Sequence, residues 1–291
     1  MKFGVREICD VVFKAKSSGN LGTYAYNAGQ PVLYIDSAKT STIEGASTTV
    51  YAQGGKGNAR LIAWEGEKTL TFTVEDALLS PIGFAILSGA QILKPSEGVT
   101  TTKVHTTAVG RMDNSGKINL TDNLTNDEKI CSTAPVFVMV RDGDNSLTGE
   151  MLDGFTIDVS GQSLSKEGVT EGKDVFVDFY VEKKIANVHE LTIDAGNFAG
   201  NWYVEASTLF RRQEDGKDLP AEIVFPNVKI QSNFTFNMAA TGDPSTFTFT
   251  MDALPGRVEG KTENVLCVIQ VVEDEFAETA GAVTSKDSIV D

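Results

Sequence analysis

Short segments in which apolar and polar residues alternate recur along most of the chain. Clear examples are residues 70–74, 155–159, 190–194 and 246–251, which are rich in threonine, valine and phenylalanine. A period of two is typical of strands with one face in a core and one in solvent, as in antiparallel sheets. Residues 175–181 are more continuously apolar, which predicts a strand buried on both faces.

Clusters of Asp, Asn, Ser and Gly separate these segments. They lie at residues 113–116, 142–145, 214–217 and 241–244 and have the composition of turns. Short strands joined by regular turns predict a mainly β fold, an antiparallel β-sandwich or barrel. We expect extended arms at both ends of the chain.

One segment, residues 74–89, departs from the period of two. Its apolar residues Leu78, Leu79, Ile82, Ala85 and Ile86 have near-helical spacing. Pro81 would lie in the first turns, where proline is tolerated, and Gly89 would end the helix. The sequence therefore predicts one short α-helix.

Five consecutive regions describe the expected organisation. They are an N-terminal arm and first strand (1–30), a β-hairpin and helix (31–94), an insertion or small subdomain (95–150), the remaining sandwich (151–270) and an acidic C-terminal arm (271–291). The 95–150 region stands apart because it is richer in Thr, Asn and Asp and less regularly patterned.

Composition narrows the function classes. Hydrophobic residues make up 41%, enough for a real core, and the net charge is 25 − 40 = −15. Such a charge repels phosphate, which argues against sequence-reading nucleic-acid binding but allows a surface past which DNA slides. The first residues do not resemble a signal peptide, and no run approaches the length of a membrane span.

The residues with catalytic or metal-binding chemistry lack the partners that they would need. His105 and His189 have no GxSxG elbow beside them, so we expect neither to be catalytic. Cys9, Cys131 and Cys267 form no CxxC pair, which predicts reduced thiols rather than zinc ligands.

Two loops resemble ligand sites in part. Residues 142–153 carry oxygen ligands at alternate positions, yet Leu147 replaces the glycine of a calcium loop, and a plain hairpin turn is favoured. Residues 54–58 (Gly-Gly-Lys-Gly-Asn) lack the phosphate-loop frame and lead into the strand-like run 59–63, which favours a hairpin connection. We therefore expect no cofactor and no metal.

Residues 189–256 contain a regular order of strands and turns. Strands at 189–194 and 201–205 are followed by residues 209–212, the turn 214–217 and strands at 221–230 and 233–238; the turn 241–244 then leads to residues 246–254. This order resembles that of phage tail tube proteins. Upstream, residues 55–64, a connection at 65–68 and residues 69–74 resemble the hairpin of these proteins. Residues 75–79 would begin the helix that follows it.

This resemblance implies a β-sandwich whose subunits form stacked, hexameric rings around a lumen for DNA. It implies self-association, contacts with tail sheath, tape measure and baseplate or neck proteins, and a place in the virion tail after synthesis in the host cytoplasm. Acidic residues lining the lumen would repel DNA phosphates. The turn residues that we expect to serve assembly are Gly54, Gly55, Gly57, Asn58, Gly242, Asp243 and Pro244.

Other functions stay open at this point. Capsid decoration proteins and baseplate hub rings also use acidic β domains. A carbohydrate-binding β-sandwich would present exposed aromatic residues on one face, and a hydrolase would depend on His105 or His189.

Overall fold

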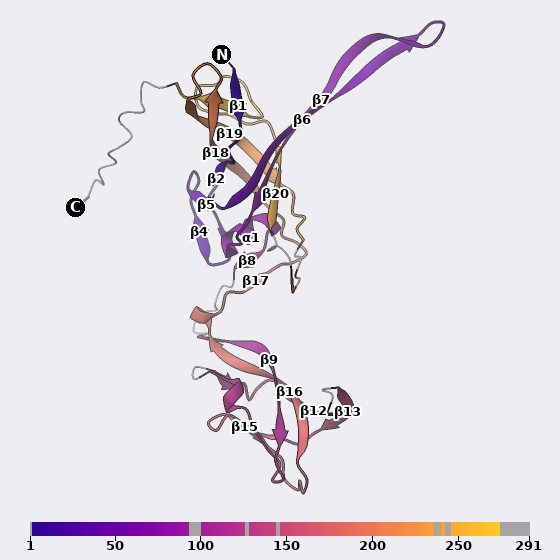
Figure 1. The fold of residues 1–291 in the computed structure, drawn as a ribbon, viewed down its shortest axis with the longest axis vertical. Coiled ribbons are helices and arrows are strands. Elements are labelled where there is room, and N and C mark those ends of the chain that lie inside the picture. The colour runs from indigo at the N-terminus through magenta and orange to yellow at the C-terminus, as the bar shows by residue number, and fades with distance from the viewer. Residues whose placement is uncertain are drawn as a thin grey trace, which may run out of the picture. The chain divides into compact units, whose positions relative to one another are not determined.

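The chain folds into two compact units. The computed structural model describes residues 2–92, 100–125, 128–143, 146–235, 238, 240–241 and 246–273 (Figure 1). The first unit consists of residues 1–94 and 191–291, and the second of residues 95–190. The second unit is therefore an insertion in the chain of the first.

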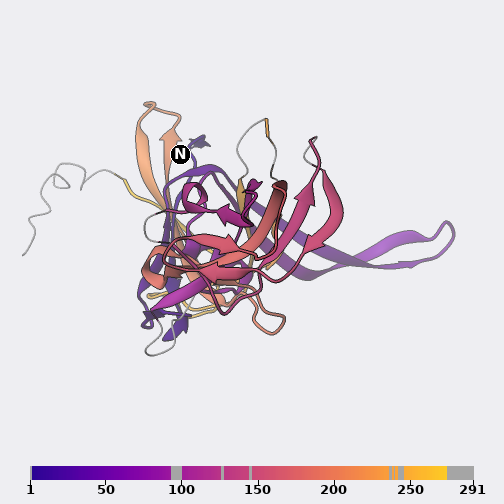
Figure 2. The ribbon, with the colours of Figure 1, turned by 90° about the horizontal axis from the view of Figure 1, so that it is seen from below.

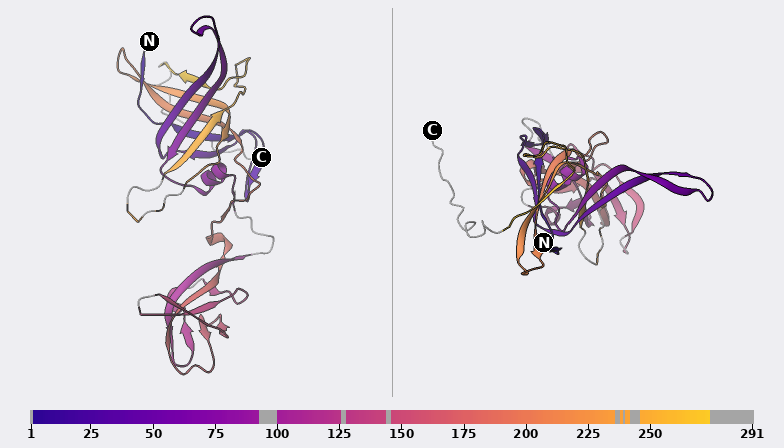
Figure 3. Two further views of the ribbon diagram at one scale, coloured as in Figure 1. Left: turned by 90° about the vertical axis from the view of Figure 1, so that its right-hand side faces the viewer. Right: turned by 90° about the horizontal axis from the view of Figure 1, so that it is seen from above.

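A nine-stranded antiparallel sheet forms the frame of the first unit. Its strand order is β5-β2-β18-β19-β20-β7-β6, with β1 paired to β18 and β21 paired to β19. Figure 3 shows the twist of this sheet. The strands are β1 (Phe3–Val5), β2 (Asp10–Ala15), β5 (Pro31–Ile35), β6 (Ala38–Gly54), β7 (Ala59–Asp76), β18 (Asn201–Arg212), β19 (Asp218–Ile230), β20 (Phe247–Ala253) and β21 (Val268–Val271).

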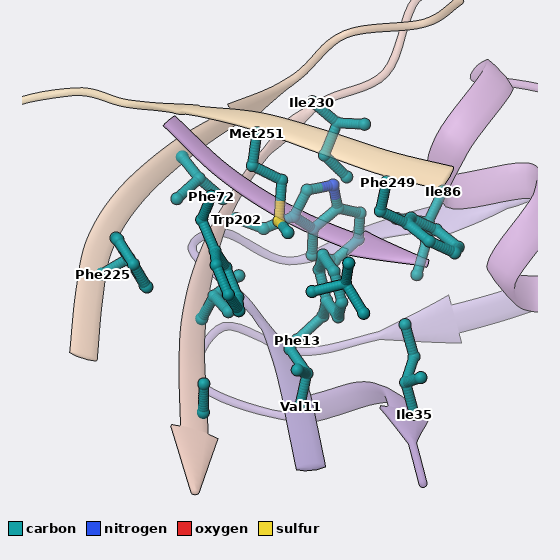
Figure 4. Packing of buried hydrophobic residues seen from close by; sticks show 14 of the residues in the cluster. Val11, Phe13, Ile35, Phe72, Ile86, Trp202, Phe225, Ile230, Phe249 and Met251 are labelled. Atoms are coloured by element: carbon teal, nitrogen blue, oxygen red, sulfur yellow. The ribbon is translucent and has the colours of Figure 1, made fainter. Parts of the chain in front are cut away.

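Small elements cover one face of this sheet. They are α1 (Pro81–Ser88), the pair β3 (Gly19–Leu21) and β4 (Tyr24–Tyr26), and the pair β8 (Gln91–Ile92) and β17 (Leu191–Thr192). The covered face is the core: Phe13, Phe72, Phe225 and Phe249 are almost fully buried and point toward one another (Figure 4). The rings of Phe72 and Phe225 stack with their centroids 4.9 Å apart.

The predicted helix is confirmed, as is its C-terminal end. The Ser80 hydroxyl accepts a hydrogen bond from the Gly83 amide at 2.9 Å, Pro81 occupies the first turn, and Gly89 ends the helix in the left-handed conformation (φ 76°). The helix does not begin within residues 75–79, however. Glu75 and Asp76 still pair with β20 and β6, so β7 ends at Asp76.

The hairpin that precedes the helix confirms the connection expected at residues 54–58 but not the one expected at residues 65–68. Its turn lies at residues 55–58, and the two strands are β6 and β7. The expected connection at residues 65–68 is instead a β-bulge within β7, where Gly66 and Glu67 lie opposite Thr48. The strand expected at residues 233–238 does not form at residues 233–235 or 238, and residues 236–237 lie outside the described part of the chain.

The second unit has an eight-stranded antiparallel sheet with its own core. Its strand order is β13-β12-β16-β9-β10-β15-β14, with β11 paired to β16. The elements are β9 (Thr101–Met112), β10 (Lys117–Asn119), η1 (Thr121–Asn123), β11 (Lys129–Ile130), β12 (Phe137–Arg141), β13 (Leu147–Leu152), β14 (Thr156–Asp158), β15 (Ser163–Ser165), β16 (Lys173–Lys184) and η2 (Ile185–Asn187).

The structure differs from two expectations for this part of the chain. Residues 151–190 belong to the second unit rather than to the first, because β14, β15 and β16 pair within its sheet. The β16 strand alternates: Val175, Val177, Phe179 and Val181 are buried, whereas Phe176 and Tyr180 are partly exposed. Only one face of β16 therefore lies in the core.

Within the described residues, no helix is long and apolar enough to cross a membrane.

Replacing Phe225 by Ala should lower the free energy of unfolding of the first unit by about 3–5 kcal/mol, because it leaves a cavity beside Phe72. Urea unfolding followed by tryptophan fluorescence measures this unit alone, since both tryptophans, Trp64 and Trp202, belong to it. Thr250→Ala, on the solvent face of the neighbouring strand β20, is the control and should change the free energy little. A Phe225→Ala loss no larger than that of the control would contradict the packing described here.

Candidate functional site

The second face of the nine-stranded sheet is polar. Antiparallel pairing places residues of β6, β7 and β20 side by side in three rows on this face. The rows are Thr40–Glu75–Thr248, Thr42–Thr73–Thr250 and Glu44–Thr71–Asp252. Each row carries hydroxyl or carboxylate groups where the core face has Phe72, Val74 or Met251.

The polar face continues across β19, β18 and β2. Asp252 pairs with Lys229, Glu222 pairs with Ser207, and Ser207 pairs with Asp10. Carboxylates outnumber the cations on this face, where Asp10, Glu44, Glu75, Glu205, Asp218, Glu222 and Asp252 accompany Lys14, Arg211 and Lys229. The face is therefore electronegative as well as hydrophilic.

Hydrogen bonds between strands fix the carboxylates of this face. Glu75 accepts from the hydroxyls of Thr40 (3.2 Å) and Thr246 (2.5 Å). Asp252 accepts from the Gln231 amide at 3.1 Å and from the Thr71 hydroxyl at 3.4 Å. These bonds hold the two carboxylates in defined positions on the polar face.

The electrostatic environment shifts three pKa values. The Thr246 hydrogen bond, with a smaller contribution from Thr40, lowers the pKa of Glu75. Burial, and then the charges of Glu205, Glu222 and Glu259, raises the pKa of Tyr203. Asp10 raises the pKa of Tyr34 through its charge. The part of each tyrosine shift that comes from charge is that of a negative surface.

The hairpin formed by β6 and β7 extends beyond this sheet. Strand β20 pairs with β7 no further than Thr71, so residues 59–70 of β7 pair with β6 alone. Figure 2 shows this hairpin, and also the hairpin of β18 and β19, projecting from the first unit. We call residues 46–69 the long arm.

Apolar side chains lie on the long arm without a core to cover them. Val50 pairs with Trp64, and Ala52 with Ile62, so these four share one face. Val50, Ile62 and Trp64 are 62%, 55% and 53% exposed, and Leu61 is 67% exposed. A two-stranded ribbon is marginally stable in water by itself. Such an arm is a surface that gains stability when another chain covers it.

The tip of the long arm contains four of the residues that we expected to serve assembly. Gly54 ends β6, and Gly55, Gly57 and Asn58 form the turn, all three with positive φ (78°, 86° and 51°). The Asn58 amide donates to the Gly55 carbonyl at 3.2 Å. Gly242, Asp243 and Pro244 lie outside the described residues.

The residues considered for catalysis lie on exposed surfaces. His105 Nε2 lies 2.9 Å from Asp178 Oδ1 on the solvent face of β9 and β16, with the Tyr180 ring beside it. His189 is exposed just before β17. Among the described residues, no group of three or more His, Cys, Asp or Glu is arranged to hold a metal ion. In the loop considered for calcium, β12 and β13 form a hairpin, and residues 144–145 lie outside the described part.

The solvent face of the second unit carries an apolar row that the sequence did not reveal. Pairing aligns Val109, Phe176, Met139 and Met151 across four strands. The alternation along each strand was visible, but which strands are neighbours was not. The threonine rows of the first unit could not be predicted for the same reason, because the sequence does not show which strands are neighbours.

A polar sheet face that none of the described elements covers and a projecting apolar arm define a structural β protein, one that acts through extended surfaces. The model of the YomU/Tube protein family matches residues 4–267, and the chain belongs to this family. The resemblance to phage tail tube proteins is thereby confirmed. No curated protein matches the chain.

Glu75 should make the stability of the first unit depend on pH. Folding lowers the pKa of Glu75 below its ordinary value of 4.5. Its contribution to the free energy of unfolding is therefore complete at pH values above 4.5, and it is lost as the pH falls through the pKa of the folded state. Glu75→Gln should therefore lower the urea midpoint at neutral pH and approach the wild type at about pH 2.5. Glu65→Gln, on the long arm, serves as the control. Equal deficits of Glu75→Gln at both pH values would refute this assignment.

Proposed function

We propose that this protein is the tail tube subunit of a long-tailed bacteriophage and polymerises as stacked, hexameric rings. In this proposal the polar face of the nine-stranded sheet lines the conduit through which DNA is ejected. The observation that carries the proposal is the polar, electronegative face, which no described element of its own unit covers, on a sheet whose edge strand continues into the long arm. Membership of the tube family supports the same assignment.

The electrostatics of the polar face suit a conduit. A duplex carries one negative charge per about 1.7 Å of its axis. Carboxylates repel it, and neutral threonines such as Thr73 and Thr250 offer no cation on which a phosphate would be retained. DNA would thus pass without specific binding, which agrees with the net charge of −15.

The long arm supplies the contact between rings in this proposal. Its exposed Ile62 and Trp64 would be buried against a second copy of this chain, and its glycine-rich tip would accommodate a close approach of backbones. A contact between different surfaces of two copies repeats along an axis and so produces a filament. Tail sheath, tape measure and baseplate or neck proteins are the further partners that a virion tail would provide.

Electron microscopy of the purified protein tests assembly. We expect the wild type to form tubes or stacked rings, whose symmetry averaging would give directly. Ile62→Ser/Trp64→Ser should abolish tubes while leaving the fold intact, because the arm is outside the core. Leu78→Ser removes an exposed apolar residue (69% exposed) outside the arm and should assemble normally. Stable monomers or trimers of the wild type would instead support a decoration protein.

Lysines placed on the polar face should turn the conduit into a DNA trap. We expect tubes of Thr73→Lys/Thr250→Lys to retain a fluorescent DNA duplex that wild-type tubes release, with retention falling as salt increases. Thr101→Lys/Thr107→Lys, which adds the same charge to the exposed face of β9, is the matched control. Equal retention by both variants would argue against a lumenal position of the polar face.

A further inference from the structure

The apolar row on the solvent face of the second unit lies open to solvent. It crosses four neighbouring strands, with Val109 on β9 at one end and Met151 on β13 at the other. These two side chains are 55% and 50% exposed, and Phe176 and Met139 between them are partly exposed. The core of this unit lies on the opposite face of the sheet and does not account for the row.

Exposed apolar residues of the second unit are confined to this region. Among its described residues, the large apolar side chains that are exposed all lie in the row or beside it, and they are Val109, Phe137, Leu147 and Met151. Elsewhere the solvent face of the same sheet is polar, since Lys117 pairs with Ser165 and Ser165 pairs with Thr156. A confined apolar patch on a polar surface marks a contact with another protein.

One side of the apolar row carries a net positive charge. There Arg111 pairs with Asp174 across β9 and β16 and forms an ion pair with it at 3.2 Å. Arg141 lies on the same side, because the residue before it, Val140, pairs with Val175, the residue after Asp174. Two arginines and one carboxylate give this side 2 − 1 = +1. We call Arg111, Asp174 and Arg141 the positive side.

The other side of the row carries a carboxylate. Asp178 on β16 pairs with Thr107 on β9 and with Phe137 on β12. The neighbouring His105 has its Nε2 atom 2.9 Å from Asp178 Oδ1, and with a neutral histidine this side has a charge of −1. We call Thr107, Asp178 and Phe137 the negative side. The apolar row therefore lies between charges of opposite sign.

This order of charges is complementary to a second copy of the same face. When two such faces meet about a two-fold axis that runs along the apolar row, the rows lie opposite each other. The positive side of each copy then lies opposite the negative side of the other, whereas a two-fold axis along the strands would place like charges together. The strands of the two sheets stay aligned, as in face-to-face packing of sheets.

The charge balance of this face also favours a second copy over repulsion. The positive and negative sides sum to +1 − 1 = 0, although the whole chain has a net charge of −15. Two copies can therefore approach through this face without the repulsion that their net charge produces elsewhere. Phe and Met in the row and Arg beside it are the residue types that protein–protein contacts favour.

We propose that the second units of two copies of this chain associate face to face through the apolar row. Burial of Phe176 and Met151 from both copies stabilises the contact. Attraction between Arg141 of each copy and Asp178 of the other sets its orientation. A two-fold contact is closed and joins two copies only. It therefore goes beyond the proposed function, because it neither extends a ring or tube nor requires one.

Sedimentation velocity of the full chain over a concentration series tests the contact. The starting protein carries Ile62→Ser/Trp64→Ser, so that the long arm makes no contact and the second unit is measured by itself. We expect this protein to dimerise and the addition of Phe176→Ser/Met151→Ser to leave monomers with an unchanged circular dichroism spectrum. Lys117→Ser/Thr156→Ser changes the polar row of the same sheet and is the matched control, which should still dimerise.

Charge reversal tests the orientation of the two copies. Arg141→Asp gives both sides of the row a charge of −1, and Asp178→Arg gives both a charge of +1, so each variant alone should lose the dimer. Arg141→Asp/Asp178→Arg in one chain exchanges the two sides and should restore it. An equal mixture of the two single variants should form mixed dimers, because one copy is then positive and the other negative on both sides.

Three results would overturn the proposal. They are a monomer throughout the concentration series, a dimer that persists in Phe176→Ser/Met151→Ser, and a failure of both the double charge reversal and the mixture to dimerise. A monomer would leave the apolar row to a different protein. Tubes of the wild type are scored separately by electron microscopy, so the failure of this proposal is distinguishable from that of the proposed function.

Discussion

The antiparallel register that joins β6, β7 and β20 is the constraint on which the surfaces of the first unit depend. Side chains alternate between the two faces, so a slip of one residue would exchange Phe72 and Val74 for Thr71 and Thr73. Burial of those apolar side chains contributes roughly 1.5–3 kcal/mol each, which strongly favours one register. The core thereby fixes the composition of the opposite face, and the threonine rows follow from it.

The long arm depends on the same register but not on the same core. Beyond Thr71, the described part of the chain gives its strands no third strand and no covering element, so local hydrogen bonds and cross-strand pairs hold the arm. The bulge at Gly66 and Glu67 interrupts this ladder and increases its local twist, which redirects the arm relative to its base. A rigid base and a weakly supported end suit a segment that acquires its full stability on contact with another chain.

Local sequence signals predicted where the elements lie better than they predicted which strands pair with each other. The alternation at residues 70–74 and the helix signals of Pro81 and Gly89 act over a few positions, and the structure agrees with them. The polar cluster at residues 65–68 was misinterpreted because a bulge and a turn both favour glycine. The rows of the polar face join residues such as Glu75 and Thr248, far apart in sequence, and alternation carries no information on such pairing. The exposed Ile62 and Trp64 likewise have the sequence signature of a core strand.

The boundary of the inserted unit has a physical explanation that composition could not supply. Strands β8 and β17 pair directly, with Ile92 opposite Leu191, so the chain leaves the first unit and returns to it at neighbouring positions. The turn after β3 rests on this pair: the Gly22 amide donates to the Gln91 side chain, and a β-carbon at Gly22 would collide with the Ile92 carbonyl. Because the two crossing points are joined to each other, the insertion requires no opening of the nine-stranded sheet. The first unit can therefore keep its polar face and its long arm whatever the inserted sheet presents to solvent.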